Sequence, residues 1–251
     1  MTSEQSVPAE LRARWNDLAS RAARDNRPCF SRFTPAEDQI PAQKIAERQG
    51  VLCEAYGGAP NTTRVMLCFT PFIVDPEVYP IRRLTATWYG DADLNHRDFL
   101  GSLIGCDVQR ETIGDILIDL PSHMVQVFVA ETVAPVLLEA WTMVGATPIS
   151  CTDTQPLCLT PGATLQPIRG TVASLRADAV LALALHLSRE KAAELIKKGQ
   201  VVRYHAPITQ PNASIELGDV LSVRGYGKYR IAEVGGTTRK GRIQITVQKY
   251  A

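Results

Sequence analysis

The first part of the chain has apolar residues at helical spacing. In the run AELRARWNDLASRAARD one stripe is formed by Leu11, Trp15, Leu18 and Ala22. Further on, Thr34 precedes Pro35 and Glu37 follows, a pattern that is typical of the start of a helix. Together these features predict an N-terminal helical segment over residues 1–50.

Short runs rich in β-branched and aromatic residues follow, and helical runs lie between them. The strand-like runs are RVMLCF, RRLTATWYG, DILID, MVQVFVA and ATPISC, and the helical runs are NHRDFLGSLIG and ETVAPVLLEAW. This alternation predicts a small α+β domain of RRM-like or ferredoxin-like type over residues 51–153. The next run, TQPLCLTPGATLQP, has three prolines and a glycine, which predicts a linker over residues 154–167.

The last part of the chain opens with two short helical runs that meet at Leu187–Ser188. Ser188 is typical of a helix N-cap, and Gly199 of the left-handed residue just past a helix C-terminus. The two helices are expected to pack through Leu175, Val180, Leu183, Leu187, Leu195 and Ile196. The strand-like runs VVRY, DVLSVRG, KYRIAEV and GRIQITVQ come next, so the pattern predicts a helix pair on a small sheet over residues 168–251. The fold class is α+β.

Composition adds a division of charge. Apolar residues make up 45% of the 251 residues and charged residues 21%, which is ordinary for a globular protein. The formal net charge is +1, but from Ile168 onward there are 14 Lys and Arg against 6 Asp and Glu, a net +8, which leaves −7 for the rest. A basic end of this kind indicates a polyanion or an acidic membrane surface, although a merely solvated basic face is equally consistent with charge alone.

The cysteines, the histidines and the lengths of the apolar runs indicate which classes of protein can be excluded. The six cysteines include no C-x-x-C pair and lie in apolar or strand-like surroundings, which favours reduced, buried thiols over disulfides or zinc. The four histidines do not fall at metal-ligand spacings, so neither metal nor cofactor is expected. The N-terminus is polar and no apolar run is long enough to cross a bilayer, so we expect a cytoplasmic protein with no membrane partner.

Two motifs resemble catalytic ones but lack residues that the corresponding chemistry requires. GTTRKGR has Arg242 and Ile243 where a phosphate loop needs lysine and a hydroxyl residue, and it joins two strands. The HRD at residues 96–98 has Leu103 where a kinase needs its metal-binding asparagine, and Asn95 as a helix N-cap explains it more simply. No catalytic residue is predicted.

The basic residues of the last part carry a stronger signal. Arg189 lies in the first turn of its helix, where the dipole favours an acid, so a phosphate would explain it. Lys197 follows eight residues later, about 80° from Arg189 around the axis, and Lys198 follows nine residues later, about 180° from Arg189. The full set of candidate RNA-binding residues is Arg176, Arg189, Lys191, Lys197, Lys198, Arg203, Arg224, Lys228, Arg230, Arg239, Lys240 and Arg242. Bases could stack on Tyr204, Tyr226 and Tyr229, which lie among them. Taken together, they favour an RNA or phosphate-backbone surface.

The run SLRADAVLALALHLSREKAAELIKKGQV, followed by IELGDVLSVRG, resembles an S4 RNA-binding domain over some fifty residues. The resemblance rests on Arg176 and Asp178 at the first helix, the Ser188–Arg189 pair, the helix exit around Gly199, and the pair Gly218–Asp219. The resemblance implies that Arg176, Arg189, Lys197 and Lys198 contact RNA.

With HRDFLGSLIGCDVQRETIGDIL and RFTPAEDQI placed before that domain, the whole chain resembles the YlmH family of bacterial proteins. This resemblance implies an RRM-like middle domain and a non-enzymatic, ribosome-associated protein. It would bind structured RNA (rRNA, with tRNA as a further partner) on the large subunit, in quality control or rescue of stalled subunits. The middle domain lacks the aromatic run with which an RRM binds RNA, since VQVFVAE has only Phe128.

Two other functions stay open at this point. An RNA-modifying enzyme of the pseudouridine synthase type would use the S4 domain as an anchor, but it needs a catalytic aspartate in a GRLD-like context, and Asp91, Asp93 and Asp98 are poor substitutes. A protein adaptor linked to cell division would instead dock a partner on the acidic N-terminal body.

Overall fold

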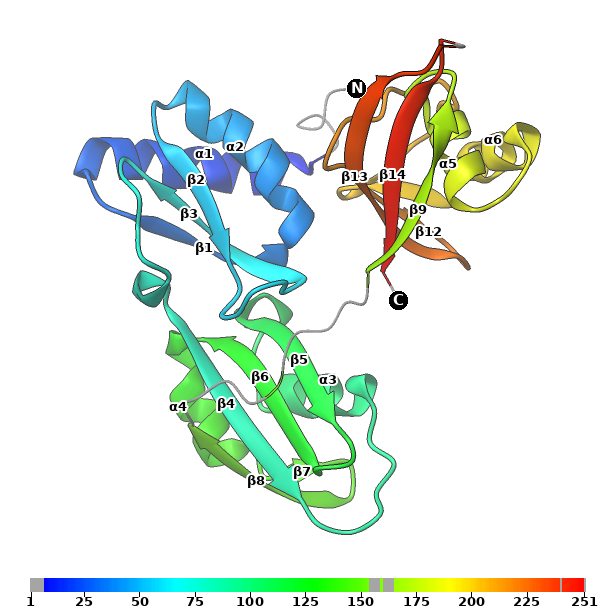
Figure 1. Ribbon diagram of the computed structural model, residues 1–251. Coiled ribbons are helices and arrows are strands. Elements are labelled where there is room, and N and C mark those ends of the chain that lie inside the picture. Colours follow the sequence, from blue (N-terminus) through cyan, green and yellow to red (C-terminus); the bar gives the residue numbers. More distant parts are fainter. Residues whose placement is uncertain (1–6, 154–158, 160–164, 240, 251) are drawn as a thin grey trace. The chain divides into compact units, whose positions relative to one another are not determined.

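The computed structural model describes residues 7–153, 159, 165–239 and 241–250 and divides into two compact units (Figure 1). The larger unit is Trp15–Gly162, and the C-terminal unit is Ala163–Ala251 together with Met1–Arg14. The helices are α1 (Ala9–Asp25), α2 (Gln39–Arg48), α3 (His96–Gly105), α4 (Ala134–Ala140), α5 (Ala177–Ala184) and α6 (Arg189–Lys197). Within the described residues, none of the helices is both long and apolar enough to cross a membrane.

The strands form three antiparallel sheets. The larger unit contains β1 (Cys29–Pro35), β2 (Leu52–Tyr56), β3 (Arg64–Thr70), β4 (Ile81–Trp88), β5 (Ile113–Asp119), β6 (Met124–Ala130), β7 (Met143–Val144) and β8 (Thr147–Asp153). The C-terminal unit contains β9 (Leu165–Val172), β10 (Val201–Arg203), β11 (Ala206–Pro207), β12 (Val220–Val223), β13 (Gly227–Thr237) and β14 (Ile243–Tyr250).

The N-terminal half of the larger unit is a three-stranded sheet in the order β1-β3-β2, with α2 against β2 and β3. The segment up to Arg48 contains the predicted helices and, in addition, the strand β1, which the pattern did not predict. A register shift between Phe30 and Phe33 interrupts the alternation of β1, so the period-two signal is lost there. Helix α2 begins at Gln39, after a 3-10 turn in which the Thr34 hydroxyl donates to the Asp38 carboxylate.

The second half of the larger unit has the predicted RRM-like topology, but it begins at β4 and not at residue 51, because β2 and β3 pair with β1 in the three-stranded sheet. Its elements run β4-α3-β5-β6-α4-β8, and the sheet order is β5-β6-β4-β8, with β7 added beside β8. This is the β-α-β-β-α-β arrangement of ferredoxin-like folds. Alternate residues of the strands pack against α3 and α4 and form one core: Leu84, Ala86, Trp88, Val125, Val127 and Val129 from the strands, with Phe99, Leu103 and Leu137 from the helices. The capping box of Asn95 and Asp98 at the start of α3 confirms the predicted N-cap.

The opposite face of the RRM-like sheet is not open. Phe128, at the centre of β6, is fully buried in a second core with Phe33, Met66 and Tyr79 from the N-terminal half. Gly58 lies against its ring in a left-handed conformation (φ +97°), and a Cβ at this position would lie 2.3 Å from Phe128 Cδ1. The aromatic residue that could have stacked on RNA is therefore used to join the two halves of the unit.

A buried carboxylate completes this junction. Asp115 on β5 accepts hydrogen bonds from the Thr63 backbone N–H (2.6 Å), the Thr63 hydroxyl (2.8 Å) and the Arg64 backbone N–H (2.9 Å). The Arg64 guanidinium donates to the carbonyls of Ile113 and Phe33, both at 3.0 Å. Because Thr63 immediately precedes β3 and Arg64 is its first residue, these bonds tie the first sheet to the second.

The C-terminal unit is a six-stranded sheet in the order β11-β10-β12-β13-β14-β9, with α5 and α6 against it (Figure 1). Of the six apolar residues predicted for the helix pair, Val180 and Ile196 lie in the buried core, and the other four are partly buried and pack against it. Edge strand β9 begins at Leu165, inside the predicted linker, whose residues 154–158 and 160–164 lie outside the described residues. Pro167 favoured a linker in the sequence. An edge strand tolerates this proline because the side of the strand that faces away from β14 needs no backbone N–H donor.

We predict that replacing Asp115 with Ala lowers the free energy of unfolding of the larger unit by about 2–4 kcal/mol, because three donors lose a charged acceptor. All three tryptophans lie in this unit, so tryptophan fluorescence during urea unfolding measures it. Asp119→Ala, at the end of the same strand, is the control and is expected to change stability by less than about 0.5 kcal/mol. Equal effects of the two variants would contradict the role of Asp115.

Candidate RNA interface

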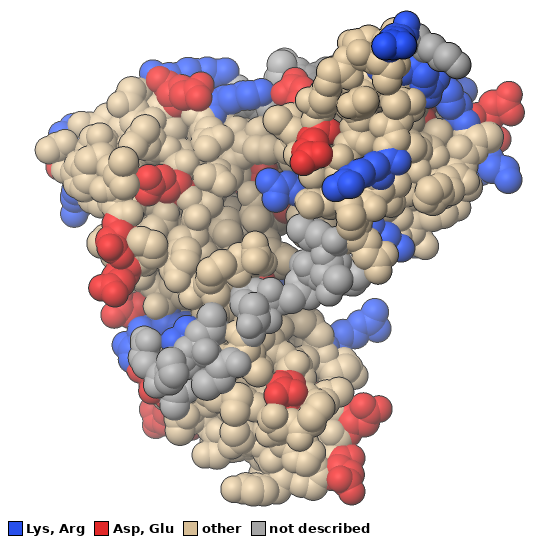
Figure 2. All heavy atoms as spheres, viewed as in Figure 1, with Lys and Arg blue, Asp and Glu red and all other residues tan. Residues whose placement is uncertain are grey.

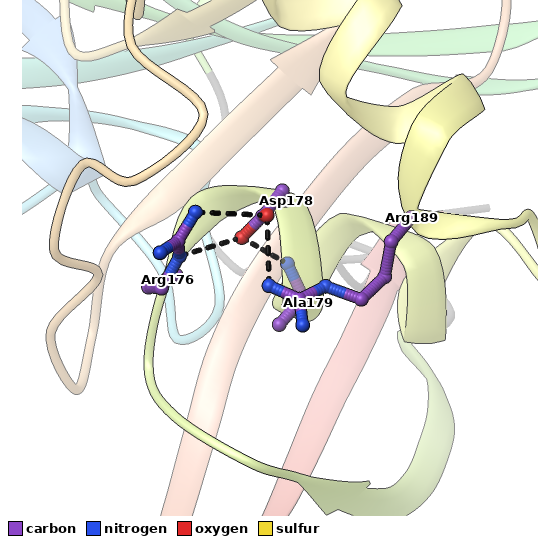
Figure 3. Close-up of polar contacts among 4 residues, drawn as sticks. All are labelled: Arg176, Asp178, Ala179 and Arg189. Carbon is purple, nitrogen blue, oxygen red and sulfur yellow. Dashed lines mark hydrogen bonds and ion pairs between the residues drawn. The ribbon is translucent and has the colours of Figure 1, made fainter.

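One buried carboxylate holds two arginines of the helix pair (Figure 3). Asp178, in the first turn of α5, accepts from Arg176 Nε (3.1 Å), from Arg189 Nη2 (2.8 Å) and from the backbone N–H of Ala179 (2.9 Å). The Asp178 side chain is 9% exposed, whereas those of Arg176 and Arg189 are 44% and 53% exposed. The two guanidiniums are thus fixed on one side and open to solvent on the other.

The electrostatics of this cluster favour its charged form. Burial alone would raise the pKa of Asp178, but the hydrogen bonds and charges of Arg176 and Arg189 outweigh it and lower the pKa. Asp178 is therefore ionised at neutral pH, and the three groups carry one net positive charge. Arg189, which the helix dipole alone did not explain, has a local partner that the sequence reasoning missed; the nearby Asp178 was the available signal.

The helix α6 carries further cations along its length. Its ends confirm the predicted N-cap and C-terminus: the Ser188 hydroxyl accepts from the Lys191 backbone N–H (3.3 Å), and Gly199 has φ +67°. Lys197 and Lys198 are exposed, about 12 Å along the axis from Arg189. Lys198 Nζ lies 3.5 Å from Glu194 Oε2. Both side chains are exposed, so this ion pair leaves the lysine accessible. The basic positions of α6 therefore extend over the whole helix.

Of the remaining predicted cations that the structure describes, Lys191 lies in the first turn of α6 and the others lie on the sheet or in its turns. Exposed residues of the set, besides those already described, are Lys191, Arg224, Arg230, Arg239 and Arg242. Lys228 is half-buried, with its ammonium 5.5 Å from the centre of the Tyr250 ring, and Arg242 donates to the hydroxyl and carbonyl of Thr171. Lys240 lies outside the described residues. Figure 2 shows basic side chains, interrupted by acidic ones, over α6 and near the β13–β14 turn.

A groove lies where α6 ends. It has a volume of about 570 Å³, and its lining includes Lys198, Gly199, Gln200, Arg224 and Lys228. The Arg224 backbone N–H donates to the Gln200 carbonyl (2.9 Å), which fixes the end of β12 beside the helix exit. Three cations around exposed backbone are suited to a phosphate group of a polyanion.

Three of the sequence predictions for this surface are wrong. Arg203 is 4% exposed and its Nη1 lies 3.0 Å from Asp219 Oδ2, so it is a core residue and not a surface contact. Tyr204 is also buried, and its hydroxyl donates to Asp219 (2.6 Å). Tyr229 is buried as well, and only Tyr226 of the three tyrosines is exposed. A buried carboxylate needs such partners, and the Gly218–Asp219 pair gave no sign that it would be buried.

The described residues contain no group of three or more His, Cys, Asp or Glu side chains that could hold a metal ion. Their five cysteines are free thiols, and Cys158 lies outside the described residues. Burial raises the pKa of both Cys53 and Cys68 to about 12.

Comparisons with known proteins agree with this architecture. A family model described as "Putative RNA-binding domain in YlmH" matches residues 90–156. The ribosome-associated protein quality control protein P2 of Bacillus subtilis (strain 168) is 27% identical over 223 residues, which are 86% of this chain and 85% of that protein. The solved structure of the cell division protein ylmH from Streptococcus pneumoniae has a TM-score of 0.50 at 17% identity and covers 59% of this chain and 93% of its own, which shows a shared fold.

The fold and the site define an α+β protein that joins an RRM-like domain to a basic helix-pair domain. The chain is similar to proteins of the YlmH family.

We predict that the Asp178 cluster makes stability depend on pH. A lowered pKa in the folded state stabilises the protein above the unfolded pKa of about 3.9, and this contribution is lost as the pH falls through the folded value. Asp178→Asn should therefore cost about 1 kcal/mol at pH 7 and less at pH 3. Urea unfolding followed by circular dichroism at both pH values checks this, and a cost that does not change with pH would contradict it.

We also predict that Arg203 acts on stability. Arg203→Ala leaves Asp219 buried without its cation and should lower the free energy of unfolding of the C-terminal unit by about 3–5 kcal/mol. Hydrogen exchange of the β10 and β12 amides measures this unit. Arg224→Ala, an exposed arginine next to β12, is the matched control and should leave the exchange unchanged. Normal exchange in Arg203→Ala would refute the structural role.

Proposed function

We propose that the protein binds structured RNA on the ribosome through the basic face of its C-terminal unit and acts in ribosome-associated quality control. The observation that carries this proposal is that Asp178 orients Arg176 and Arg189. Lys197 and Lys198 lie at the end of α6, the helix that Arg189 begins. The name of the Bacillus subtilis relative, which includes ribosome association and quality control, supports the setting, and the family model supports RNA as the ligand.

The chemistry of the basic face fits RNA in two ways. Guanidiniums held at fixed positions can bind phosphates with paired hydrogen bonds, and little conformational freedom is lost on binding because Asp178 has already ordered them. Each neutralised phosphate releases a counterion, so affinity should fall steeply with salt. Selectivity would come from the shape of a folded RNA, since double-stranded RNA offers side chains few base edges to read.

The finer parts of the proposal follow from the same face. We assign the helix pair and the sheet behind it to an S4-type RNA-binding domain. The two packed helices α5 and α6, which the S4 resemblance predicts, support this assignment. The RNA would be rRNA of the large subunit, with tRNA as a second partner, in the cytoplasm. The role would be non-enzymatic: the protein binds and positions RNA and does not modify it.

We predict that the triple variant Arg189→Glu/Lys197→Glu/Lys198→Glu binds purified large ribosomal subunits with an affinity at least tenfold lower than wild type at about 0.1 M salt, as measured by co-sedimentation. Three reversed charges should also make the slope of log affinity against log salt shallower by roughly two to three. The measurement is a salt series with wild type and variant, with circular dichroism to show that both are folded.

The matched control reverses the same number of charges elsewhere. Arg24, Arg27 and Arg48 are exposed cations of the larger unit, and their triple replacement by Glu changes the net charge equally. This control should lose affinity less than threefold and keep the wild-type slope. Equal losses in the two triple variants would reject a specific basic face, and uridine isomerisation by the wild type on total RNA would reject the non-enzymatic role.

A further inference from the structure

The larger unit contains a cavity that the basic face does not involve. Its volume is about 440 Å³, within the range of small-molecule sites, and it opens where the RRM-like sheet meets the three-stranded sheet. The residues that matter for its chemistry are Tyr56, Glu77, Tyr79, Ile81, Arg83 and Phe128. The cavity thus combines aromatic rings with one cation and one carboxylate.

The aromatic part of the cavity is rigid. The Tyr79 ring meets Phe30 edge-on at 5.1 Å between centroids and Tyr56 at 5.4 Å. Tyr79 is 6% exposed and Phe128 is fully buried, so the core holds both in place. Tyr56, at the end of β2, is half-buried and presents the accessible part of this aromatic wall. A planar ligand would therefore meet rings that do not need to be ordered on binding.

The polar part of the cavity comes from neighbouring elements. Arg83 on β4 lies near enough to Tyr56 for its charge to oppose the rise in the Tyr56 pKa that burial causes. Glu77, in the turn before β4, is exposed at the opening. Arg82, the next residue on the strand, lies outside the cavity lining and pairs with Asp153. The lining therefore adds one cation and one carboxylate to the aromatic wall.

These groups match one ligand chemistry better than others. A nucleobase stacks on an aromatic ring, its N–H groups donate to a carboxylate, and the attached phosphate binds a guanidinium. An aromatic side chain of a protein partner would use the rings but neither the cation nor the carboxylate. We propose that this cavity holds a single unpaired nucleotide of RNA, with its base against Tyr56 and its phosphate at Arg83.

This inference rests on the proposed function only in the choice of RNA as ligand, because the cavity is a separate surface from the basic face. It would also allow the larger unit to bind RNA at the cavity, although the sheet face around Phe128 is buried. An RNA bound to the basic face by its helical part could therefore leave an unpaired nucleotide to be bound elsewhere.

The test uses the full chain with Arg189→Glu/Lys197→Glu/Lys198→Glu as background, so that binding to the basic face is reduced. The probe is a fluorescein-labelled single-stranded RNA hexamer, measured by anisotropy. Tyr56→Leu and Arg83→Gln should each weaken binding at least fivefold, whereas Tyr56→Phe, which keeps the ring, and Arg82→Gln, the neighbouring control, should change it less than twofold.

A second measurement locates the RNA directly. Photocrosslinking of a 5-bromouridine hexamer to wild-type protein, followed by mass spectrometry, should label the peptide that contains Tyr56. Crosslinks confined to residues 165–250, or equal affinities of Tyr56→Leu and Tyr56→Phe, would overturn the inference. Co-sedimentation of the Tyr56→Leu variant with large subunits separates the two proposals. If this variant still co-sediments and the wild-type protein shows no crosslink at Tyr56, the cavity proposal fails and the proposed function stands.

Discussion

The constraint on which this structure depends is the cost of burying a carboxylate, and three of the buried aspartates show how the protein meets it. Asp115 is satisfied by the donors of Thr63 and Arg64, and it ties the first sheet of the larger unit to the second. Asp219 takes Arg203 and Tyr204 and fixes the turn before β12. Asp178 takes Arg176 and Arg189 and joins the start of α5 to the start of α6. A buried charge without such partners would cost several kcal/mol, so each aspartate dictates the local arrangement of the chain around it.

The difference between the two arginine clusters explains why one is structural and the other is a candidate site. Arg203 and Asp219 are both buried, so the arginine's charge is neutralised and inaccessible. At Asp178 only the carboxylate is buried, and one negative charge is shared by two half-exposed guanidiniums. The second arrangement keeps a net positive charge at the surface and orders the groups that carry it. An interface that binds a polyanion gains from both, because attraction remains and the entropy lost on binding is smaller.

The sequence predicted the parts of the fold that depend on local pattern. The strand β6 and the helix α3, with its Asn95 cap, were found because alternation and capping are encoded within a few residues. The strand β1 was not predicted because a register shift interrupts its alternation of buried and exposed residues. The strand β9 was not predicted because it contains Pro167, a residue that is more typical of a linker. The site shows the same limit. Exposed cations of α6 follow from helix position, whereas the burial of Arg203 depends on Asp219, a partner from a distant part of the chain, and no local pattern reveals it.

The closed face of the RRM-like sheet decides where RNA can bind on the larger unit. In an RRM the face away from the helices stacks bases on aromatic side chains. Here that face carries Phe128, and the same side chain fills the core that joins the N-terminal half. The packing that gives the unit its stability therefore removes the surface that the topology alone would suggest for binding. What stays accessible beside Phe128 is the cavity bounded by Tyr56 and Arg83, which offers room for a single ring and not for a run of stacked bases. The residues of the larger unit that would bind RNA under the proposal therefore lie at the margin of this junction and not on the sheet face.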